Sequence, residues 1–214
     1  MTARGLAVVS AGLGQPSSTR LLADQLAAAT RDELVRRGEQ VDLRPVELRE
    51  HAHDIVNHLL TGFPSESLRQ VLDQVTGADG LIAVTPIFNA SYNGLFKSFF
   101  DLLDVEALGG RPVLLGATGG TARHSLALEH AVRPMFTYLR AVTVPTAVFA
   151  APEDWSGDGA DGALRARIVR AGRELAEQIH RAAPSPGSPD PFTLTTNFHQ
   201  LLHPPPTDPR RPSI

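Results

Sequence analysis

Short apolar runs alternate along this chain with longer segments in which apolar residues recur every three or four positions. Runs of this length predict buried strands. They lie at Leu6–Ser10, Gln40–Pro45, Gly80–Val84, Arg111–Ala117 and Val142–Phe149. The third and fourth runs are almost continuously apolar, which is typical of strands in a parallel sheet that is covered on both faces.

The segments between the runs have helical periodicity. The expected helices cover 20–37, 47–61, 65–75, 94–103, 124–138 and 163–182. Ser65 is expected to cap the third helix, and Pro134 falls inside the fifth. Five strands that alternate with helices predict a three-layer α/β sandwich, in which a five-stranded parallel sheet has helices on both faces and right-handed crossovers.

Length and composition indicate one globular domain followed by a tail. The chain has 214 residues, of which 42% are hydrophobic and 20% are charged, as in an ordinary soluble domain. Prolines concentrate after Pro184, so we expect a domain at 1–183 and a Pro-rich C-terminal tail at 184–214. The apolar residues within the tail leave two interpretations open, a segment docked on a neighbouring surface and a disordered one.

Charge and cysteine content exclude several classes of protein. A formal net charge of −3 gives no electrostatic reason to expect nucleic acid or an anionic membrane as a partner. The absence of cysteine excludes disulfides, thiolate metal sites and iron–sulfur clusters. The first apolar run is too short for a signal peptide, and no run approaches a membrane span, so we expect a cytoplasmic protein.

The third strand leads into the stretch with the most chemical character, Thr85–Gly94. Pro86 is expected to end the strand because it has no backbone donor for the ladder. The residues that follow are small, aromatic or amide-bearing, and a helix begins near Gly94. Since open α/β sheets bind ligands at the carboxyl ends of their strands, this loop is expected to form the floor of a ligand site.

The loop after the first strand has the composition of a phosphate site. Gly12-Leu13-Gly14 begins a dinucleotide fingerprint, but Ser17 stands where the third glycine belongs, and no Gly-Lys-Ser/Thr follows. What remains is a set of hydroxyl residues before a helix N-terminus, where backbone amides bind anions. The alternative is that Ser17 or Ser18 only caps the helix.

Three loops of this chain resemble those of the NAD(P)H-dependent FMN reductases of the flavodoxin-like superfamily, over roughly residues 5–183. The most specific motif, Thr-Pro-x-Tyr-Asn-x-Ser-x-x-Gly-x-x-Lys, is matched from Thr85 to Lys97. A Ser-rich phosphate loop is matched by Ser10 with Ser17–Thr19, and a Gly-Gly turn after the fourth strand by Thr118–Gly120. Residues 117–125 and 153–155 are similar to the small actinobacterial-type subgroup.

The resemblance implies a flavodoxin-like sheet in strand order 2-1-3-4-5 that binds FMN and receives hydride from NADPH or NADH. Hydride transfer needs no protein acid or base, so no catalytic side chain and no metal are expected. The expected cofactor-binding residues come from the three loops. They are Ser10, Ser17, Ser18, Thr19, Pro86, Ile87, Phe88, Asn89, Ala90, Ser91, Thr118, Gly119 and Gly120.

The resemblance also implies a homodimer or homotetramer, in which Asn57 and Phe63 reach a neighbouring flavin, and delivery of reduced flavin to a monooxygenase. Reduction of quinones or azo compounds, and a low-turnover flavin-binding electron carrier, are the alternatives. Two departures from the family pattern stand out. Phe88 replaces a tyrosine, and the first loop lacks an arginine, which leaves the preference for NADH or NADPH open.

Two other groups of residues offer alternative chemistry. His51, Asp54 and His58 share one helix face at metal-ligand spacing, although solvated helix residues explain them as well. A serine hydrolase would use a serine, a histidine and an aspartate, and Ser91, His124 and Asp154 are candidates. Ser91 lacks the Gly-x-Ser-x-Gly elbow, however. Arg123 could meet a nucleotide phosphate and Trp155 could line the pocket or a subunit contact.

Overall fold

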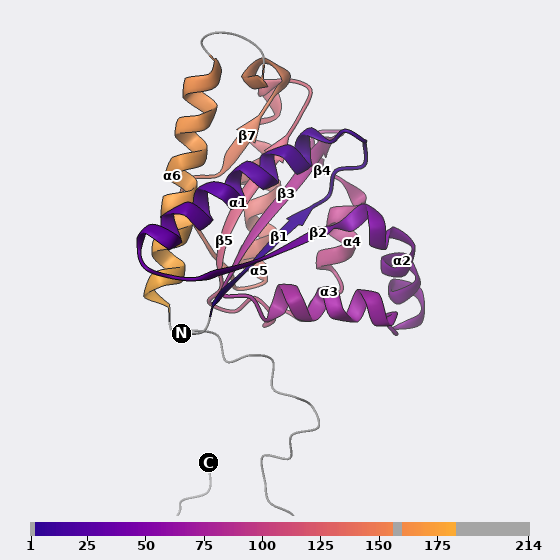
Figure 1. Ribbon diagram of the computed structural model, residues 1–214. Helices are drawn as coiled ribbons and strands as arrows, with labels where there is room; N and C mark the ends of the chain where they lie inside the picture. The colour runs from indigo at the N-terminus through magenta and orange to yellow at the C-terminus, as the bar shows by residue number, and fades with distance from the viewer. Residues whose placement is uncertain (1–2, 156–159, 183–214) are drawn as a thin grey trace, which may run out of the picture.

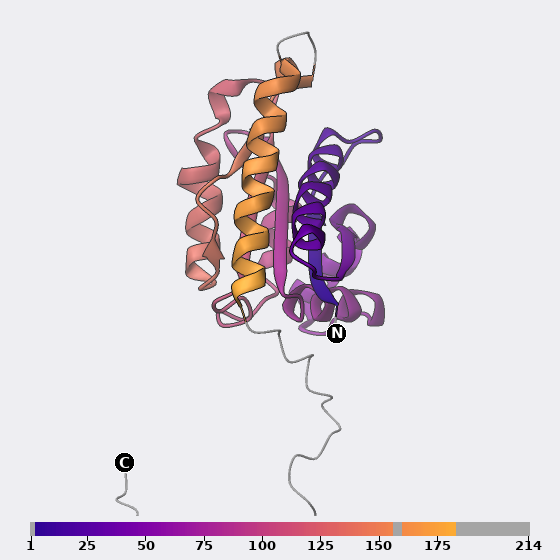
Figure 2. The ribbon, with the colours of Figure 1, turned by 60° about the vertical axis from the view of Figure 1, so that its left-hand side comes forward.

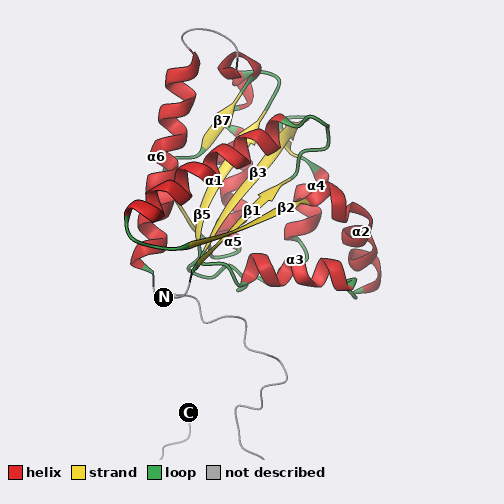
Figure 3. Ribbon diagram, in the orientation of Figure 1, coloured by secondary structure: helices red, strands yellow, loops and turns green. Residues whose placement is uncertain are grey.

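The structure is a computed structural model that describes residues 3–155 and 160–182 (Figure 1). Its strands form one sheet with a layer of helices on each side, as the colouring by secondary structure shows (Figure 3). The strands are β1 (Arg4–Ser10), β2 (Val41–Glu47), β3 (Gly80–Phe88), β4 (Ser91–Tyr92), β5 (Pro112–Thr118), β6 (Val142–Thr143) and β7 (Val148–Ala150).

The main path of the sheet runs β2-β1-β3-β5-β6, and every pairing along it is parallel. When β6 and β7 are taken together as the fifth predicted strand, this is the flavodoxin-like order 2-1-3-4-5, so that prediction is confirmed. Only β4 departs from it, as a two-residue strand antiparallel to β3. Because β1, β3 and β5 are adjacent and parallel, their carboxyl ends meet at one edge.

Six regular helices cover the sheet. They are α1 (Ser18–Arg36), α2 (Ala52–Thr61), α3 (Glu66–Thr76), α4 (Gly94–Phe100), α5 (Arg133–Tyr138) and α6 (Ala160–Arg181) among the described residues. Helices α1 and α6 pack against each other on one face. In Figure 1, α1 crosses in front of the strands and α6 runs at their left, and α6 comes to the front in Figure 2. The remaining helices cover the other face.

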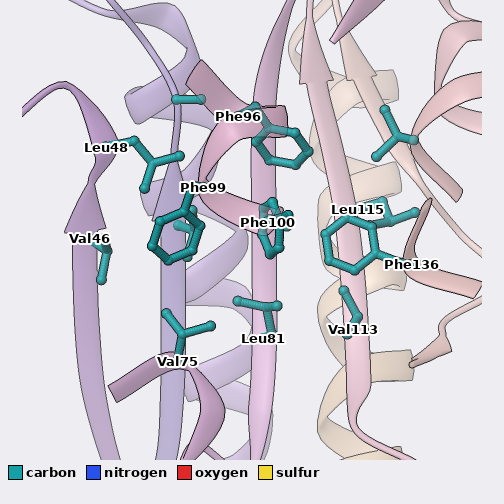
Figure 4. Packing of buried hydrophobic residues seen from close by; sticks show 14 of the residues in the cluster. Val46, Leu48, Val75, Leu81, Phe96, Phe99, Phe100, Val113, Leu115 and Phe136 are labelled. Carbon is teal, nitrogen blue, oxygen red and sulfur yellow. The ribbon is translucent and has the colours of Figure 1, made fainter. Parts of the chain in front are cut away.

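An aromatic cluster forms the centre of that second face (Figure 4). Phe96, Phe99 and Phe100 of α4 are fully or almost fully buried and contact one another or Phe136 of α5. Tilted and edge-on ring pairs of this kind add about 0.5–1.5 kcal/mol each to the free energy of area burial. The cluster holds α4 firmly under the loop that precedes it, and core packing for Phe99 and Phe100 is confirmed.

The prediction that Pro86 ends the third strand is wrong, because β3 continues to Phe88. The amide of Ala11 donates to Val84 O, so the residues of β3 that alternate with Val84 direct their backbone groups toward β1. Pro86 is the next of these, and the pairing of β1 with β3 has already ended at Ser10 and Val84. The missing donor therefore costs no ladder bond, as for proline on an edge strand.

The fifth strand is interrupted, which the sequence pattern did not predict. Pro112 pairs with Val142 and Gly116 pairs with Val148, so the segment between Val142 and Val148 is longer than the part of β5 it faces. Pro145 lies in the interruption, where no ladder hydrogen bond is required of it.

The long helix expected at 124–138 is also broken. The chain forms a 3₁₀ turn at Ala122–His124 (η2), a π turn at Leu128–Val132 (η3) and then α5. Pro134 occupies the first turn of α5, where its lack of an amide hydrogen is tolerated. In the middle of a continuous α-helix the same proline would remove a hydrogen bond and clash with the preceding turn.

The structure leaves the predicted tail untested. Residues 184–214 lie outside the described residues, and α6 ends at Arg181. Within the described part of the chain, no helix is both long and apolar enough to cross a membrane.

Candidate functional site

A cleft of about 310 Å³ opens where the loops after β1, β3 and β5 meet. Each loop contributes residues that are far apart in the sequence. The lining residues are Leu13, Gly14, Pro16, Ser17, Ser18, Thr19, Pro86, Ile87, Phe88, Thr118, Gly119, Gly120 and Pro152. None of these side chains is charged, so the lining itself offers an anion only backbone amides and hydroxyls.

The first loop delivers the N-terminus of α1 to the cleft. Ser17 is the N-cap, in extended conformation, and its Oγ accepts a hydrogen bond from Arg20 N at 3.2 Å. The amides of the first turn beyond it have no intrahelical acceptor and carry the positive end of the helix dipole, which favours a phosphate. Gly12 allows the turn to close, since a Cβ there would lie 2.0 Å from Ser17 Oγ.

The second loop is a tight hairpin that connects β3 to β4. Phe88 pairs with Ser91, and the two residues between them, Asn89 and Ala90, have φ angles of 49° and 66°. Two consecutive positive φ angles define a type I′ turn, the connection that matches the twist of a two-stranded ribbon. Phe88 is 49% exposed at the base of this hairpin and presents its ring to the cleft.

Asn93 fixes the hairpin to the first loop. This side chain is 2% exposed; its Nδ2 donates to Ala11 O at 2.8 Å, and its Oδ1 accepts from Phe96 N at 2.8 Å as the N-cap of α4. Its backbone amide donates to Thr85 Oγ1 at 3.3 Å. Through its side-chain amide and its backbone N–H, this one buried residue joins the end of β1, β3 and the start of α4.

The end of β5 forms the third wall. Thr118 Oγ1 and Thr19 Oγ1 share a buried hydrogen bond of 2.8 Å, which ties this strand end to the first turn of α1. Gly119 packs against Phe149, whose Cζ would lie 2.7 Å from a Cβ at that position. A Cβ on Gly120, by contrast, would meet nothing within 4 Å, so Gly120 leaves one side of the cleft open to a flat group.

The structure brings nine of the thirteen predicted site residues together in this cleft, all from the three expected loops. Ser10 is 3% exposed at the end of β1 and does not line the cleft. Asn89, Ala90 and Ser91 form the outer part of the hairpin, beyond the lining residues.

Four lining residues and one neighbouring cation are not among the predicted site residues. Leu13, Gly14, Pro16 and Pro152 line the cleft although none bears a functional group that marks it in a sequence. Arg49 lies in a 3₁₀ turn, η1 (Leu48–His51), and contacts the first loop from outside. Only the adjacency of β2 and β1 in the sheet brings this arginine there.

The alternative constellations gain no support. Among the described residues, no group of three His, Asp or Glu side chains is placed to hold a metal ion. Hydrogen bonds from Ser65 and Ser67 hold the pKa of Asp54 below its ordinary value, which accounts for this carboxylate as a structural group. Asp154 bonds to Arg167 and Ala151 N, and it is not joined to Ser91 by any hydrogen bond of the described chain.

Two further residues that the sequence offered for the site, Trp155 after β7 and Arg123 after β5, do not line the cleft. Trp155 lines a separate depression between α1 and α6. Arg123 belongs to η2, after the Gly-Gly turn, and its side chain is exposed. Neither is among the residues that line the cleft.

Comparison with known proteins shows which family this chain resembles in sequence. A sequence model for a family described as NADPH-dependent FMN reductase matches residues 5–156. An FMN reductase (NADPH) of Pseudomonas aeruginosa is 40% identical over 147 residues, which are 69% of this chain and 76% of that protein. A Pseudomonas putida protein named NADH-dependent FMN reductase SfnE is 34% identical over 183 residues, 85% of this chain and 95% of its own.

One solved structure is similar to this chain both in sequence and in fold. The crystal structure of an oxidoreductase from Corynebacterium diphtheriae is 44% identical and superposes with a TM-score of 0.82. The similarity covers 86% of this chain and 100% of that one.

Proposed function

The chain belongs to the NADPH-dependent FMN reductase family, and we propose that it reduces FMN with NAD(P)H in the cleft between the first loop, the β3–β4 hairpin and the Gly-Gly turn. One observation carries the proposal. The family match at 5–156 spans every residue that lines the cleft, from Leu13 to Pro152. It is an oxidoreductase whose small-molecule substrates are FMN and a nicotinamide nucleotide.

The first loop fits the phosphate end of FMN. The amides of Ser18 and Thr19 lie in the first turn of α1, where a phosphate gains both hydrogen bonds and the helix dipole. The Thr19–Thr118 hydrogen bond holds this turn against the end of β5. These residues bind and orient the cofactor, and they form no part of the electron transfer itself.

The other two walls fit the flat ring system. Ile87 and Phe88 offer apolar and aromatic surface on one side, and Gly120 leaves room on the other. Bound FMN supplies the redox chemistry, since its ring accepts hydride from the nicotinamide. None of the residues that line the cleft titrates, so the protein's part is to position the two substrates and exclude water.

The identity of the hydride donor and the fate of the reduced flavin are further parts of the proposal. Relatives of this chain are named as NADPH-dependent and as NADH-dependent enzymes, so either nucleotide is a candidate donor. We expect reduced FMN to pass to a monooxygenase, in the cytoplasm. NAD(P)H oxidation that occurs only after a quinone or an azo dye is added would favour the alternative acceptors instead.

Exposed apolar side chains support an oligomer. On α2 and just after it, Leu60 and Phe63 are 80% and 79% exposed, and Tyr138 at the end of α5 is 70% exposed. Exposed apolar side chains that form one patch mark subunit interfaces, and Leu60 and Phe63 lie three residues apart at the end of α2. We propose a homodimer or homotetramer in which Asn57 and Phe63 face a neighbouring cleft, and sedimentation analysis of the full chain tests it.

The proposed site is tested by filling it. Gly120→Val adds a side chain where nothing lies within 4 Å, so the variant should fold with unchanged stability while its FMN affinity and FMN-dependent NAD(P)H oxidation fall at least tenfold. Gly162→Val is the control, because a Cβ there also meets nothing within 4 Å and the residue lies in α6, outside the cleft. Equal FMN affinity in Gly120→Val and the wild type would place the flavin elsewhere.

A further inference from the structure

The proposed phosphate site has no positive charge of its own. The residues that line the cleft include serines, threonines, glycines and prolines but no lysine, arginine or histidine. A phosphate monoester carries a charge of about −1.5 to −2 at neutral pH. Backbone amides and hydroxyls bind such a group, but a guanidinium nearby forms stronger, charge-assisted hydrogen bonds with it.

Arg49 is placed to supply that charge. Its Nη1 lies 3.5 Å from the carbonyl oxygens of both Leu13 and Gly14. With the amide of Gln15 oriented so that its oxygen faces the guanidinium, Gln15 Oε1 lies 3.2 and 3.3 Å from Nη1 and Nη2. Arg49 therefore contacts three consecutive residues of the loop, two of which line the cleft.

These contacts leave the charge of Arg49 uncompensated. All its acceptors are neutral oxygens, and in the described part of the chain no carboxylate lies within 4.0 Å of its guanidinium. The other arginine beside the loop, Arg20, is different, because it forms ion pairs with both Asp24 and Glu47. Only one of the two guanidiniums at this loop is thus available to an incoming anion.

We propose that Arg49 is the residue that selects phosphorylated flavin, by pairing with the phosphate of FMN at the first loop. The proposal rests on the proposed function and extends it to substrate choice: FMN should bind far better than riboflavin, which has the same ring and ribityl chain but no phosphate. An arginine in the turn after β2 thereby takes the place of the cation that the first loop lacks. Because β2 pairs with β1, the turn that carries Arg49 lies beside the first loop.

The test compares the affinities of FMN and riboflavin, measured by quenching of flavin fluorescence on the full chain. Arg49→Gln removes the charge and leaves a shorter, neutral hydrogen-bond donor. FMN affinity should fall about 10- to 100-fold, the usual value of a charge-assisted hydrogen bond, while riboflavin affinity stays within about twofold. Arg49→Lys should recover part of the loss, since the charge returns without the planar fork.

Arg31→Gln is the matched control. It removes the same charge from α1, and among the described residues Arg31 pairs only with the adjacent Asp32, far along the helix from the loop. FMN and riboflavin affinities should both match the wild type in this variant.

The outcomes separate two kinds of failure. If wild-type protein binds no flavin, the proposed function itself is wrong. If the wild type binds FMN but Arg49→Gln loses FMN and riboflavin affinity equally, Arg49 only braces the loop and the proposal fails. It also fails if FMN affinity is unchanged and the KM for NADPH alone rises, because the arginine would then serve the nucleotide.

Discussion

The hydrogen bonds of Asn93 provide a sharp test of how the site is assembled. Replacing Asn93 with alanine removes both side-chain bonds, the one donated to Ala11 O and the one accepted from Phe96 N. The backbone bond from Asn93 N to Thr85 is kept. The substitution therefore disconnects the first loop from α4 without changing any residue that lines the cleft.

The size of the effect follows from burial. Loss of an N-cap side chain costs about 1 kcal/mol. A buried carbonyl left without its donor costs about a further 1–3 kcal/mol, and Ala11 is fully buried. We expect Asn93→Ala to lower the free energy of unfolding by about 2–4 kcal/mol, a large share of the 5–15 kcal/mol typical of a domain.

Urea unfolding of the flavin-free protein, followed by circular dichroism, measures this loss. Gln70→Ala is the control, because Gln70 is an exposed amide on α3 whose side chain, within the described part of the chain, bonds only to Glu66. FMN affinity of Asn93→Ala should fall as well, since the end of β1 and the hairpin are no longer held together. A loss of stability below about 0.5 kcal/mol, within the range of ordinary surface substitutions, would refute the reasoning.

Three further predictions concern single residues. Ser17→Asp preserves the helix cap but sets a negative charge against the phosphate, so stability should hold while FMN affinity drops at least tenfold. Ser65→Asp, at the cap of α3, is the control and should leave FMN affinity unchanged. Unchanged FMN affinity in Ser17→Asp would contradict the phosphate assignment. Ala90→Gly relieves a positive φ of 66° and should raise the free energy of unfolding, measured with urea, by about 1 kcal/mol. A lower free energy of unfolding in this variant would argue against the type I′ turn. A hydrogen bond from His180, together with Arg4, holds the pKa of Glu39 below its ordinary value near 4.5. The ionised carboxylate therefore stabilises the fold above pH 4.5, and this contribution is lost as the pH falls below 4.5 and through the lowered pKa. Glu39→Gln should therefore destabilise the protein more at pH 7 than at pH 3.5, and an equal loss at both values would contradict the assignment.

Most of the sheet could be predicted from the sequence because its strands are buried on both faces. β1 and β5 are buried along their whole length and appear as uninterrupted apolar runs. The end of β3 was mispredicted for a tertiary reason. Whether Pro86 breaks a strand depends on whether a neighbour needs its amide, and the sequence does not reveal that β1 has already ended there.

The residues that line the cleft could be predicted from the sequence to the extent that they carry recognisable chemistry. The hydroxyls of the first loop, the ring of Phe88 and the Gly-Gly turn are visible as residue types. The hairpin was missed because its turn is Asn89-Ala90, where the usual pattern has a glycine in second place. Arg49 was missed because its position beside the first loop depends on strand order, a property of the fold and not of any local motif.

The central claim is that FMN binds in the cleft and is reduced there by a nicotinamide nucleotide. Titration of the purified full chain with FMN, followed by NADPH and NADH oxidation at 340 nm under anaerobic conditions, tests it most directly. The wild type should bind FMN saturably and oxidise a nucleotide only when FMN is present, and both should fall at least tenfold in Gly120→Val and be kept in Gly162→Val. A wild-type protein that neither binds FMN nor oxidises either nucleotide in its presence would contradict it.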